Sequence, residues 1–387
     1  MSEKAIDLSE QKRPIFFPDL DGWRFVAFLA VFLFHSFYTD VESIQSEAAY
    51  IFIKRLTVNG TLGVEFFFVL SGFLIIYLLI AERQQTGRID IKKFYFRRIL
   101  RIFPLYYLCL FIGFIALPLA RSILGAQQYE NPDWRYYVFF LSNFETIVHA
   151  LPVEATLGVL WSVAIEEQFY LVVPFILVLV SIRSYPWVFM CAIAISLILR
   201  AIHVDDGIWL ARHTFSYVGN LAIGGLIAYF AISSPRFVGF FQNLDGAIIK
   251  AIYLVVVVMV LFQGEIFAYP ALRVFQAPFI AALFALIILE QVFAKNSFFK
   301  MRNNRVFSVC GQYTYGLYCL HVLAMAIGHR ILSRFGLTSE LWQIVFIETT
   351  FNLMLALLIA YTSYKFYEAP FLRLKALLSF QNRNIRA

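Results

Sequence analysis

The chain contains many apolar runs that are long enough to cross a membrane. Crossing about 30 Å of hydrocarbon takes roughly 20 residues of helix. Of the 387 residues, 61% are hydrophobic and only 15% are charged, a composition that a soluble domain of this size could not hide in one core. The sequence therefore predicts an all-α polytopic membrane protein. Ten runs meet the length requirement: 23 to 39, 61 to 80, 99 to 118, 162 to 181, 185 to 202, 215 to 232, 247 to 263, 272 to 293, 311 to 332 and 342 to 363.

An eleventh segment, 135 to 152, is shorter and carries Asn143, Glu145 and His149. Lys and Arg residues stay preferentially on the cytoplasmic side of a membrane. If the N-terminus lies inside and this segment does not cross, 23 of the 32 Lys and Arg residues fall on the cytoplasmic side. We therefore expect ten transmembrane helices, both termini in the cytoplasm, and 135 to 152 as a re-entrant or interfacial segment on the outer side.

The other features of the whole sequence indicate a single membrane domain with a short tail at each end. We expect a cytoplasmic N-terminal tail over 1–18, a membrane domain over 19–373 and a basic cytoplasmic C-terminal tail over 374–387. The net charge of +7 fits inner-face anchoring and does not call for a nucleic-acid partner. No signal-peptidase-like site follows the first apolar run, which indicates an uncleaved signal anchor. The four cysteines have no metal-like spacing, so we expect packed, reduced thiols and no metal.

The first apolar run holds an arginine and a histidine. Arg24 and His35 are eleven residues apart, which on a helix places them about 20° apart around the axis and ~16 Å apart along it. They could be a snorkelling arginine and a histidine that hydrogen-bonds a neighbouring helix. Ionisable groups at membrane depth are costly, however, and imidazole is suited to general-base chemistry near neutral pH. The pair is therefore a candidate functional site.

A basic cluster opens the third run, in "KKFYFRRILRIFPLYY". Arg97, Arg98 and Arg101 lie at its cytoplasmic end, where a helix N-terminus adds partial positive charge and free N–H groups. Guanidinium groups suit phosphate oxygens. Membrane anchoring would also favour basic residues here, but it does not require three. A polyanionic cytosolic ligand such as an acyl carrier would account for them.

"GVEFFFVLSGFLI" contains Glu65, Ser71 and Gly72. Small residues allow helices to approach closely, so Ser71 and Gly72 are first interpreted as packing residues. No nucleophile elbow of the G-x-S-x-G type surrounds Ser71, which argues against an acyl-serine mechanism.

Two further motifs carry titratable groups. In "LWSVAIEEQFYLVVP", one of the neighbouring carboxylates Glu166 and Glu167 is expected to face solvent while the other turns inward. In "YTYGLYCLHVLA", His321 lies about 12 Å from the inner end of its run. Two interpretations of His321 stay open, a packing residue and a functional residue.

These motifs, taken together and in order, resemble those of the acyltransferase type 3 family of integral-membrane O-acyltransferases. The resemblance runs from about residue 19 to 373 and rests on Arg24-x10-His35, "GVEFFFVLSGFLI", "RRILRIFP", "WSVAIEEQFYL", "YGLYCLH" and "YEAPFLR". It implies a ten-span bacterial inner-membrane enzyme that moves an acyl group, usually acetyl, from cytoplasmic acyl-CoA to a hydroxyl of a carbohydrate or lipid-linked sugar. Membrane lipid as the solvent of the fold already follows from the apolar composition.

The resemblance also implies roles for particular residues. Arg24 and His35 match the family's essential pair, Arg98 and Arg101 its CoA-associated Arg-x-x-Arg motif, and Glu166 the acidic residue of its Glu-x-x-Phe-Tyr motif. We expect Arg97 to assist in binding the donor.

Glu65 stands where the family more often has aspartate, and this one-methylene difference argues against a strict geometric role there. Some relatives carry a fused extracytoplasmic hydrolase-like domain. We expect none in this chain, so its membrane domain or a separate extracytoplasmic or glycan-assembly partner would complete transfer.

The residues and the resemblance combine into one mechanistic hypothesis. Acyl-CoA binds through its phosphates to Arg98 and Arg101, and its pantetheine arm threads between helices towards His35, which acts as general base or carries the acyl group itself. Arg24 helps to position the donor, and His321, Glu65 and Ser71 are additional candidates. The alternative is a transporter or exporter of a glycolipid or anionic solute that uses buried His and Arg groups, although no internal repeat supports it.

Overall fold

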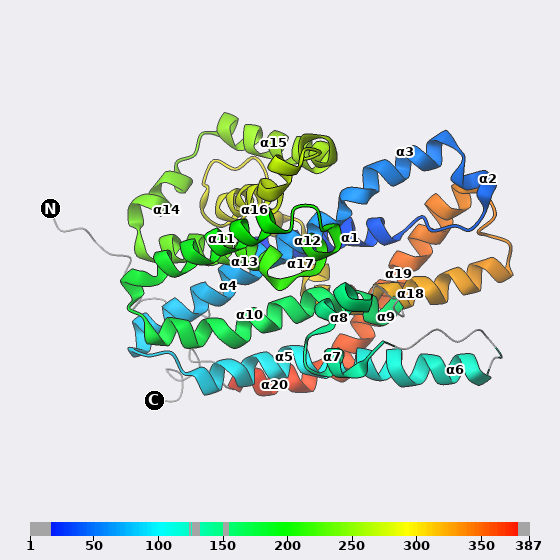
Figure 1. Cartoon of the computed structure of the whole chain (residues 1–387), viewed down its shortest axis with the longest axis horizontal. Coiled ribbons are helices and arrows are strands. Elements are labelled where there is room, and N and C mark those ends of the chain that lie inside the picture. Colours follow the sequence, from blue (N-terminus) through cyan, green and yellow to red (C-terminus); the bar gives the residue numbers. More distant parts are fainter. Residues whose placement is uncertain (1–16, 124, 126–131, 150–154, 378–387) are drawn as a thin grey trace.

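The computed structural model describes the chain except for residues 1–16, 124, 126–131, 150–154 and 378–387 (Figure 1). The described residues form helices and no strands. The long helices are α1 (Pro18–His35), α4 (Leu62–Thr86), α5 (Ile91–Phe111), α10 (Leu160–Leu179), α11 (Tyr185–Ile202), α13 (Thr214–Ser233), α15 (Gly246–Ile266), α16 (Pro270–Phe293), α18 (Thr314–Arg334) and α19 (Thr349–Thr362).

Shorter helices and helical turns connect the long helices. The short helices are α2 (Glu42–Gln45), α3 (Ala48–Thr57), α6 (Leu117–Ile123), α7 (Trp134–Val138), α8 (Ser142–His149), α9 (Ala155–Gly158), α12 (Gly207–Arg212), α14 (Pro235–Gln242), α17 (Arg305–Gln312) and α20 (Ala369–Leu377). The 3-10 turns are Val58–Thr61, Ile182–Ser184 and Met301–Asn303, and the π-helical stretches are Ile112–Ala116, Gln343–Glu348 and Ser363–Glu368.

Nine helical stretches of the described chain are long and apolar enough to cross a membrane. They correspond to nine of the ten expected runs. The tenth, 23 to 39, falls on α1, whose 18 residues include Asp19, Asp21 and Arg24. The prediction of an all-helical membrane protein is therefore confirmed, whereas the number of crossings and the cytoplasmic location of the termini stay predictions. The nine stretches are Ala48–Thr86, Ile91–Ile123, Thr156–Leu179, Ile182–Ile202, Gly207–Ser233, Gly246–Ile266, Gln276–Phe293, Thr314–Arg334 and Gln343–Leu374.

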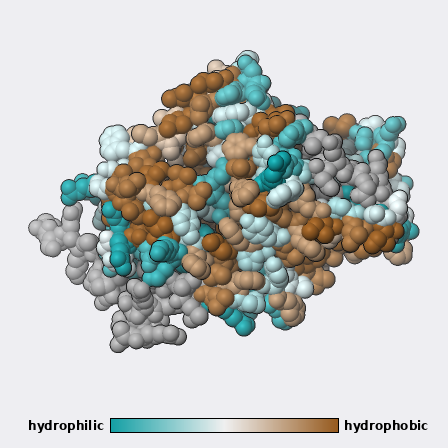
Figure 2. Space-filling view, turned by 60° about the horizontal axis from the view of Figure 1, so that its bottom comes forward, coloured by the Kyte–Doolittle hydropathy of each residue, from teal (hydrophilic) through white to brown (hydrophobic). Residues whose placement is uncertain are grey.

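The surface agrees with this class of protein. Hydrophobic side chains cover much of the face shown in Figure 2, and hydrophilic ones gather mainly towards its margins. Several of the spanning helices expose large apolar side chains, for example Leu171 and Phe175 of α10 and Leu254 and Val257 of α15. Many exposed large apolar side chains on spanning helices are typical of a surface that faces lipid.

Helix α1 ends earlier than the apolar pattern predicts. The backbone becomes extended at Ser36, and Phe37 adopts a φ of 61°, in the left-handed region that a bulky L-residue rarely enters. The apolar run continues in sequence, but this change of direction stops the helix. His35 is therefore the last residue of α1 and not an interior residue of a longer helix.

The described residues of the segment 135 to 152 do not form a helix long enough to cross. Residues 134–149 fold into α7 and α8, joined by a tight turn at Phe140, which has a φ of 56°. Gln168 of α10 donates hydrogen bonds to the Phe140 carbonyl and to the Asn143 side chain, at 2.7 and 2.9 Å, and so holds the turn against α10. Residues 150–152 lie outside the described residues, and the side of the membrane stays a prediction.

Small residues allow α4 and α13 to pack tightly. A Cβ atom added at Gly72 would overlap the carbonyl oxygen of Leu221, and one added at Gly224 would overlap that of Val69. The two backbones are therefore in mutual contact. This confirms Gly72 as a packing residue and fixes α4 at the centre of the largest hydrophobic core.

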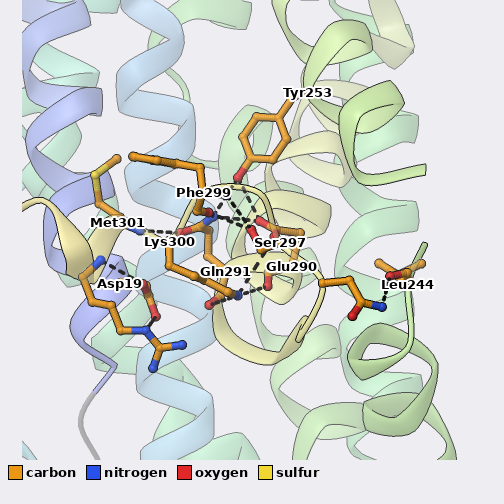
Figure 3. Close-up of polar contacts among 11 residues, drawn as sticks. Asp19, Leu244, Tyr253, Glu290, Gln291, Ser297, Phe299, Lys300 and Met301 are labelled. Atoms are coloured by element: carbon orange, nitrogen blue, oxygen red, sulfur yellow. Dashed lines mark hydrogen bonds and ion pairs between the residues drawn. The ribbon is translucent and has the colours of Figure 1, made fainter. Parts of the chain in front are cut away.

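A polar cluster ties the loop after α16 to the beginning of α1 (Figure 3). Lys300 Nζ donates to the backbone carbonyls of Glu290 and Gln291, both at 2.7 Å, and the Arg302 N–H donates to Asp19 at 2.9 Å. Because α17 follows this loop directly, these bonds also set its position. A Cβ added at Gly311 of α17 would overlap the carbonyl of Asp21, so α17 lies directly against α1.

All four cysteines are free thiols. Cys109 and Cys319 are buried, as expected for packed thiols. Cys191 is exposed on α11, so the expectation of packing is wrong there. Helix α11 is a candidate membrane span, and its outward face needs only an apolar side chain.

Candidate active site

A cavity of about 490 Å³ lies among α1, α4, α5, α10, the α17–α18 junction and the end of the α19–α20 helix. Its polar lining includes Arg24, Ser71, Arg98, Arg101 and Glu166. These five residues come from four motifs that are far apart in the sequence. The structure therefore brings most of the predicted site residues to one place.

Two of the arginines that line the cavity have no anionic partner. Arg98 is sandwiched between aromatic rings, with its guanidinium carbon 5.7 Å from the Phe94 ring centre and 5.5 Å from that of Tyr170. Its buried Nε has no hydrogen-bond partner within the described chain. Among the described residues neither Arg98 nor Arg101 forms an ion pair, whereas Arg24 is paired with Asp21 one turn earlier in α1. Glu166 lines the same cavity, but no carboxylate pairs with Arg98 or Arg101 in the described chain, so both guanidinium groups can bind an anionic ligand.

The start of α5 places these arginines. The Asp90 carboxylate accepts the Lys93 N–H at 3.1 Å and caps the helix, and it forms an ion pair with the Lys93 ammonium at 2.8 Å. These two interactions hold the pKa of Asp90, which lies outside the spanning segments, below its usual value. Arg98 and Arg101 follow within the first three turns, one turn apart, so that both reach the cavity.

Ser71, Glu166 and Tyr170 form a hydrogen-bonded group in the cavity wall. The Ser71 hydroxyl donates to Glu166 Oε1 at 2.7 Å, and the Tyr170 hydroxyl donates to Ser71 Oγ at 2.9 Å and faces Glu166 Oε2 at 3.3 Å. Ser71 is thus more than a small packing residue. Glu167 does not face solvent as expected, since its Oε1 is buried and lacks a hydrogen-bond partner within the described chain.

His35 and His321 meet at the end of α1. His321 Nε2 lies 3.2 Å from His35 Nδ1, and the ring centres are 5.1 Å apart. His321 is completely buried in α18, while His35 is partly exposed. Sequence reasoning identified each histidine separately but did not predict their contact, because the two are 286 residues apart.

Tyr318 separates this histidine pair from the cavity. Its side chain lines the cavity, its hydroxyl lies 2.6 Å from Ser162 Oγ, and its ring centre is 6.1 Å from that of His321. Neither histidine belongs to the cavity lining in the described chain. The cavity therefore does not reach His35, and Tyr318, held by its contact with Ser162, is a lining residue that also contacts His321.

Besides the two histidines, two further predicted residues lie outside the cavity. Arg97 forms an ion pair at 2.9 Å with Glu82, whose carboxylate is buried, so it does not join Arg98 and Arg101 as expected. The helix periodicity explains this, because Arg97 points about 100° away from Arg98. Glu65 accepts a hydrogen bond from Asn220 of α13 at 3.1 Å and contributes to the contact between α4 and α13.

Sequence reasoning missed several residues that shape the site. Tyr170 lies four residues after Glu166 on one helix face, and Asp21 lies three residues before Arg24, so helical spacing could have indicated both. Nothing in the sequence indicated that Tyr318 would lie between the cavity and the histidines, because that depends on how α10 and α18 pack.

Comparison with known proteins shows the family to which the chain belongs. A family model described as an acyltransferase domain matches residues 17–365. A provisionally named O-acetyltransferase of Staphylococcus aureus (strain COL) is 26% identical over 396 residues, covering 95% of this chain and 59% of that protein. The O-acetyltransferase OatA of Staphylococcus aureus (strain NCTC 8325 / PS 47) is 30% identical over 188 residues, covering 46% of this chain and 28% of that protein. No solved structure matches the chain.

The chain thus spans about 59% of the length of curated relatives such as the strain COL protein. What those longer proteins do as a whole is therefore a hypothesis for this chain and not a finding.

Proposed function

Because this chain belongs to the acyltransferase type 3 family, we propose that it is an acyl-CoA-dependent O-acyltransferase of the bacterial inner membrane. It moves an acyl group, acetyl in the simplest case, to a hydroxyl of a cell-surface polysaccharide, O-antigen, exopolysaccharide or lipid-linked sugar. The names of its relatives support O-acetyl transfer. The observation that carries the proposal is the cavity in which Arg98 and Arg101 form no ion pair with any described residue.

The donor binds first in this scheme. Phosphate groups of acyl-CoA bind Arg98 and Arg101, whose guanidinium forks donate paired hydrogen bonds to phosphate oxygens. The positive end of the α5 macrodipole adds to the attraction only over its first turn, so most of the binding energy comes from the side chains. The aromatic sandwich around Arg98 fixes its guanidinium plane in advance and lowers the entropy cost of binding.

Transfer then takes place at His35. Its imidazole removes the proton from the acceptor hydroxyl, the oxygen attacks the thioester carbonyl carbon, and the carbon–sulfur bond breaks. The proton passes from His35 to the leaving thiolate, which departs as free CoA. If His35 instead carries the acyl group for a time, the same nitrogen attacks the thioester first and the acceptor hydroxyl attacks second.

Tyr318 controls access between these two places. The acyl arm reaches His35 only when the phenol leaves its contact with Ser162. Lid movements of this kind commonly occur between binding and chemistry. A closed resting position also keeps water away from the thioester until an acceptor is present.

The test is transfer of labelled acetyl from acetyl-CoA by the purified protein, with membranes from cells that lack it as the source of acceptor. We expect acceptor-dependent release of CoA thiol, loss of release in His35→Ala, and normal release in His149→Ala, since His149 is exposed on α8 outside the cavity. Active His35→Ala protein would remove this residue from the mechanism. A wild-type protein that never releases CoA would favour a transporter.

A further inference from the structure

His321 is held by its own polar contacts and also touches His35 directly. It is completely buried, and both of its ring nitrogens have a polar neighbour. Its Nδ1 lies 2.8 Å from the Tyr318 backbone carbonyl and its Nε2 lies 3.2 Å from His35 Nδ1. His35 Nδ1 in turn lies 3.0 Å from the Val31 carbonyl.

These neighbours fix the positions of the protons. A carbonyl oxygen only accepts hydrogen bonds, so His321 Nδ1 must carry the proton that it donates to Tyr318. In a neutral imidazole the other nitrogen, Nε2, then has a lone pair. His35 Nδ1 faces this lone pair and the Val31 carbonyl, which are two acceptors. His35 Nδ1 must therefore carry a proton that it shares between them.

The reverse arrangement would require a cation. If His321 Nε2 donated to His35, both nitrogens of His321 would carry protons and its ring would be charged. Among the described residues the histidines in ion pairs are His149 and His329, so neither His35 nor His321 has a carboxylate partner. The charged side chains that act on the His35 ring, Arg212 of α12 and Lys54 of α3, are themselves positive. An uncompensated buried cation beside them is strongly unfavourable.

We propose that His321 is the positioning residue that holds His35 in the tautomer with its proton on Nδ1. The inference rests on the proposed function of His35. In this tautomer the lone pair is on Nε2, and no described residue forms a hydrogen bond with that nitrogen. His35 Nε2 is thus the atom that takes the proton of the acceptor hydroxyl, or that attacks the thioester.

The arrangement also helps when His35 becomes positively charged. As Nε2 gains a proton, the hydrogen bond from Nδ1 to His321 Nε2 becomes charge-assisted and therefore stronger. The proton on Nε2 then returns to the departing sulfur, so that His35 and His321 are both regenerated. A histidine in this role resembles in principle the carboxylate or carbonyl that orients other catalytic imidazoles.

The test compares two substitutions at one position. His321→Gln retains an amide oxygen that can accept the proton of His35 Nδ1, whereas His321→Phe fills the space between Phe28 and Tyr318 without an acceptor. We expect His321→Phe to lower kcat for acetyl transfer roughly 100-fold with an unchanged KM for acetyl-CoA. The reason is that His35 would no longer be held with its proton on Nδ1, and an imidazole in the wrong tautomer loses most of its general-base catalysis. We expect His321→Gln to keep most of kcat.

Membrane abundance and the thermal shift on adding CoA serve as folding controls for both variants. Wild-type kcat in His321→Phe would overturn the inference, and so would an equal loss in both variants, which indicates a packing role. If wild-type protein transfers acetyl and His35→Ala does not, such a result leaves the proposed function standing. If the wild-type protein transfers nothing, both proposals fall together.

Discussion

At the scale of single residues, neighbouring arginines of α5 have different roles. Arg98 and Arg101 line the cavity and have no anionic partner in the described chain, whereas Arg97 pairs with Glu82. The same residue type on adjacent positions thus lines a cavity or forms a buried ion pair, according to the helix face on which it lies. Kinetics and stability should separate the two roles.

We predict that Arg98→Ala and Arg101→Ala each raise the KM for acetyl-CoA. A hydrogen bond to a charged group contributes about 1.5–3 kcal/mol, which corresponds to a roughly 10- to 150-fold change. Initial rates over a range of acetyl-CoA concentrations measure this effect, provided that chemistry is slower than donor dissociation. Lys92→Ala is the matched control, because Lys92 is an exposed cation at the start of the same helix. An equal effect of Lys92→Ala would indicate general electrostatic attraction.

For Arg97→Ala we predict a loss of stability without a change in KM. The substitution leaves the buried Glu82 carboxylate without its 2.9 Å partner, and breaking a buried ion pair in this way costs roughly 3–5 kcal/mol. Thermal denaturation in detergent measures the change. Arg97→Ala combined with Glu82→Gln should recover part of the loss, since the buried charge is then absent. A rise in KM with unchanged stability would place Arg97 in donor binding after all.

At the scale of elements, helix ends and helix contacts position the site. The cap at Asp90 fixes where α5 begins and hence which side chains point into the cavity. The close contact of α4 with α13 fixes the rotation of α4 and hence the direction of Ser71. Neither feature carries chemistry itself, yet both decide whether the site forms.

We predict that Asp90→Ala destabilises the protein by about 1 kcal/mol and that Asp90→Asn does so much less, because asparagine also caps helices. The lowered pKa of Asp90 means that its contribution is present at neutral pH and is lost as the pH falls through that lowered value. Thermal denaturation between neutral and acidic pH should therefore show an acid-dependent loss in wild type that is reduced in Asp90→Asn. Identical pH profiles would contradict this role.

Gly72→Ala should destabilise the contact between α4 and α13. Its added methyl group overlaps the Leu221 carbonyl, and overpacking of this kind typically costs about 1–3 kcal/mol. Gly264→Ala in α15 is the control, because nothing lies within 4 Å of a Cβ atom at that position. Thermal unfolding of the two purified variants compares them. Equal stability would show that the helices can move apart without cost.

At the scale of the whole molecule, residues from one end of the helix bundle line much of the cavity that we propose binds the donor. The beginnings of α1, α5 and α18 and the beginning of α20 all contribute to the cavity. The basic loop between α16 and α17 is joined to the same end through Asp19 (Figure 3). Under the predicted orientation this end faces the cytoplasm, where acyl-CoA is available.

We predict that reporter fusions after residue 306 and at the C-terminus indicate a cytoplasmic location. The physical reason is the concentration of Lys and Arg in the loops at this end, which cross membranes poorly. A fusion in the segment 40 to 60 should indicate the opposite side. External reporters after residue 306 would place the arginine cavity on the wrong side for a cytosolic donor and would overturn the proposed mechanism.

The sequence by itself determined the class of protein and the candidate residues. The length of an apolar run is a local property, because the free energy of transfer into lipid is a sum over the residues of one helix. Nine of the ten runs could therefore be located without knowledge of the tertiary structure. The order of the motifs along the chain likewise indicated the family. Local backbone conformation was harder to predict from the sequence. Helix α1 ends at His35 because of the turn at Phe37, and that turn leaves no signal in the hydropathy pattern.

Only the tertiary structure decided which polar groups meet. The rotation of each helix about its axis turned Arg97 to Glu82 and Arg98 to the cavity, joined Ser71 to Glu166, and placed Tyr318 before the histidine pair. Helix rotations follow from side-chain packing between segments up to 286 residues apart, such as His35 and His321, and hydropathy and spacing do not encode this packing.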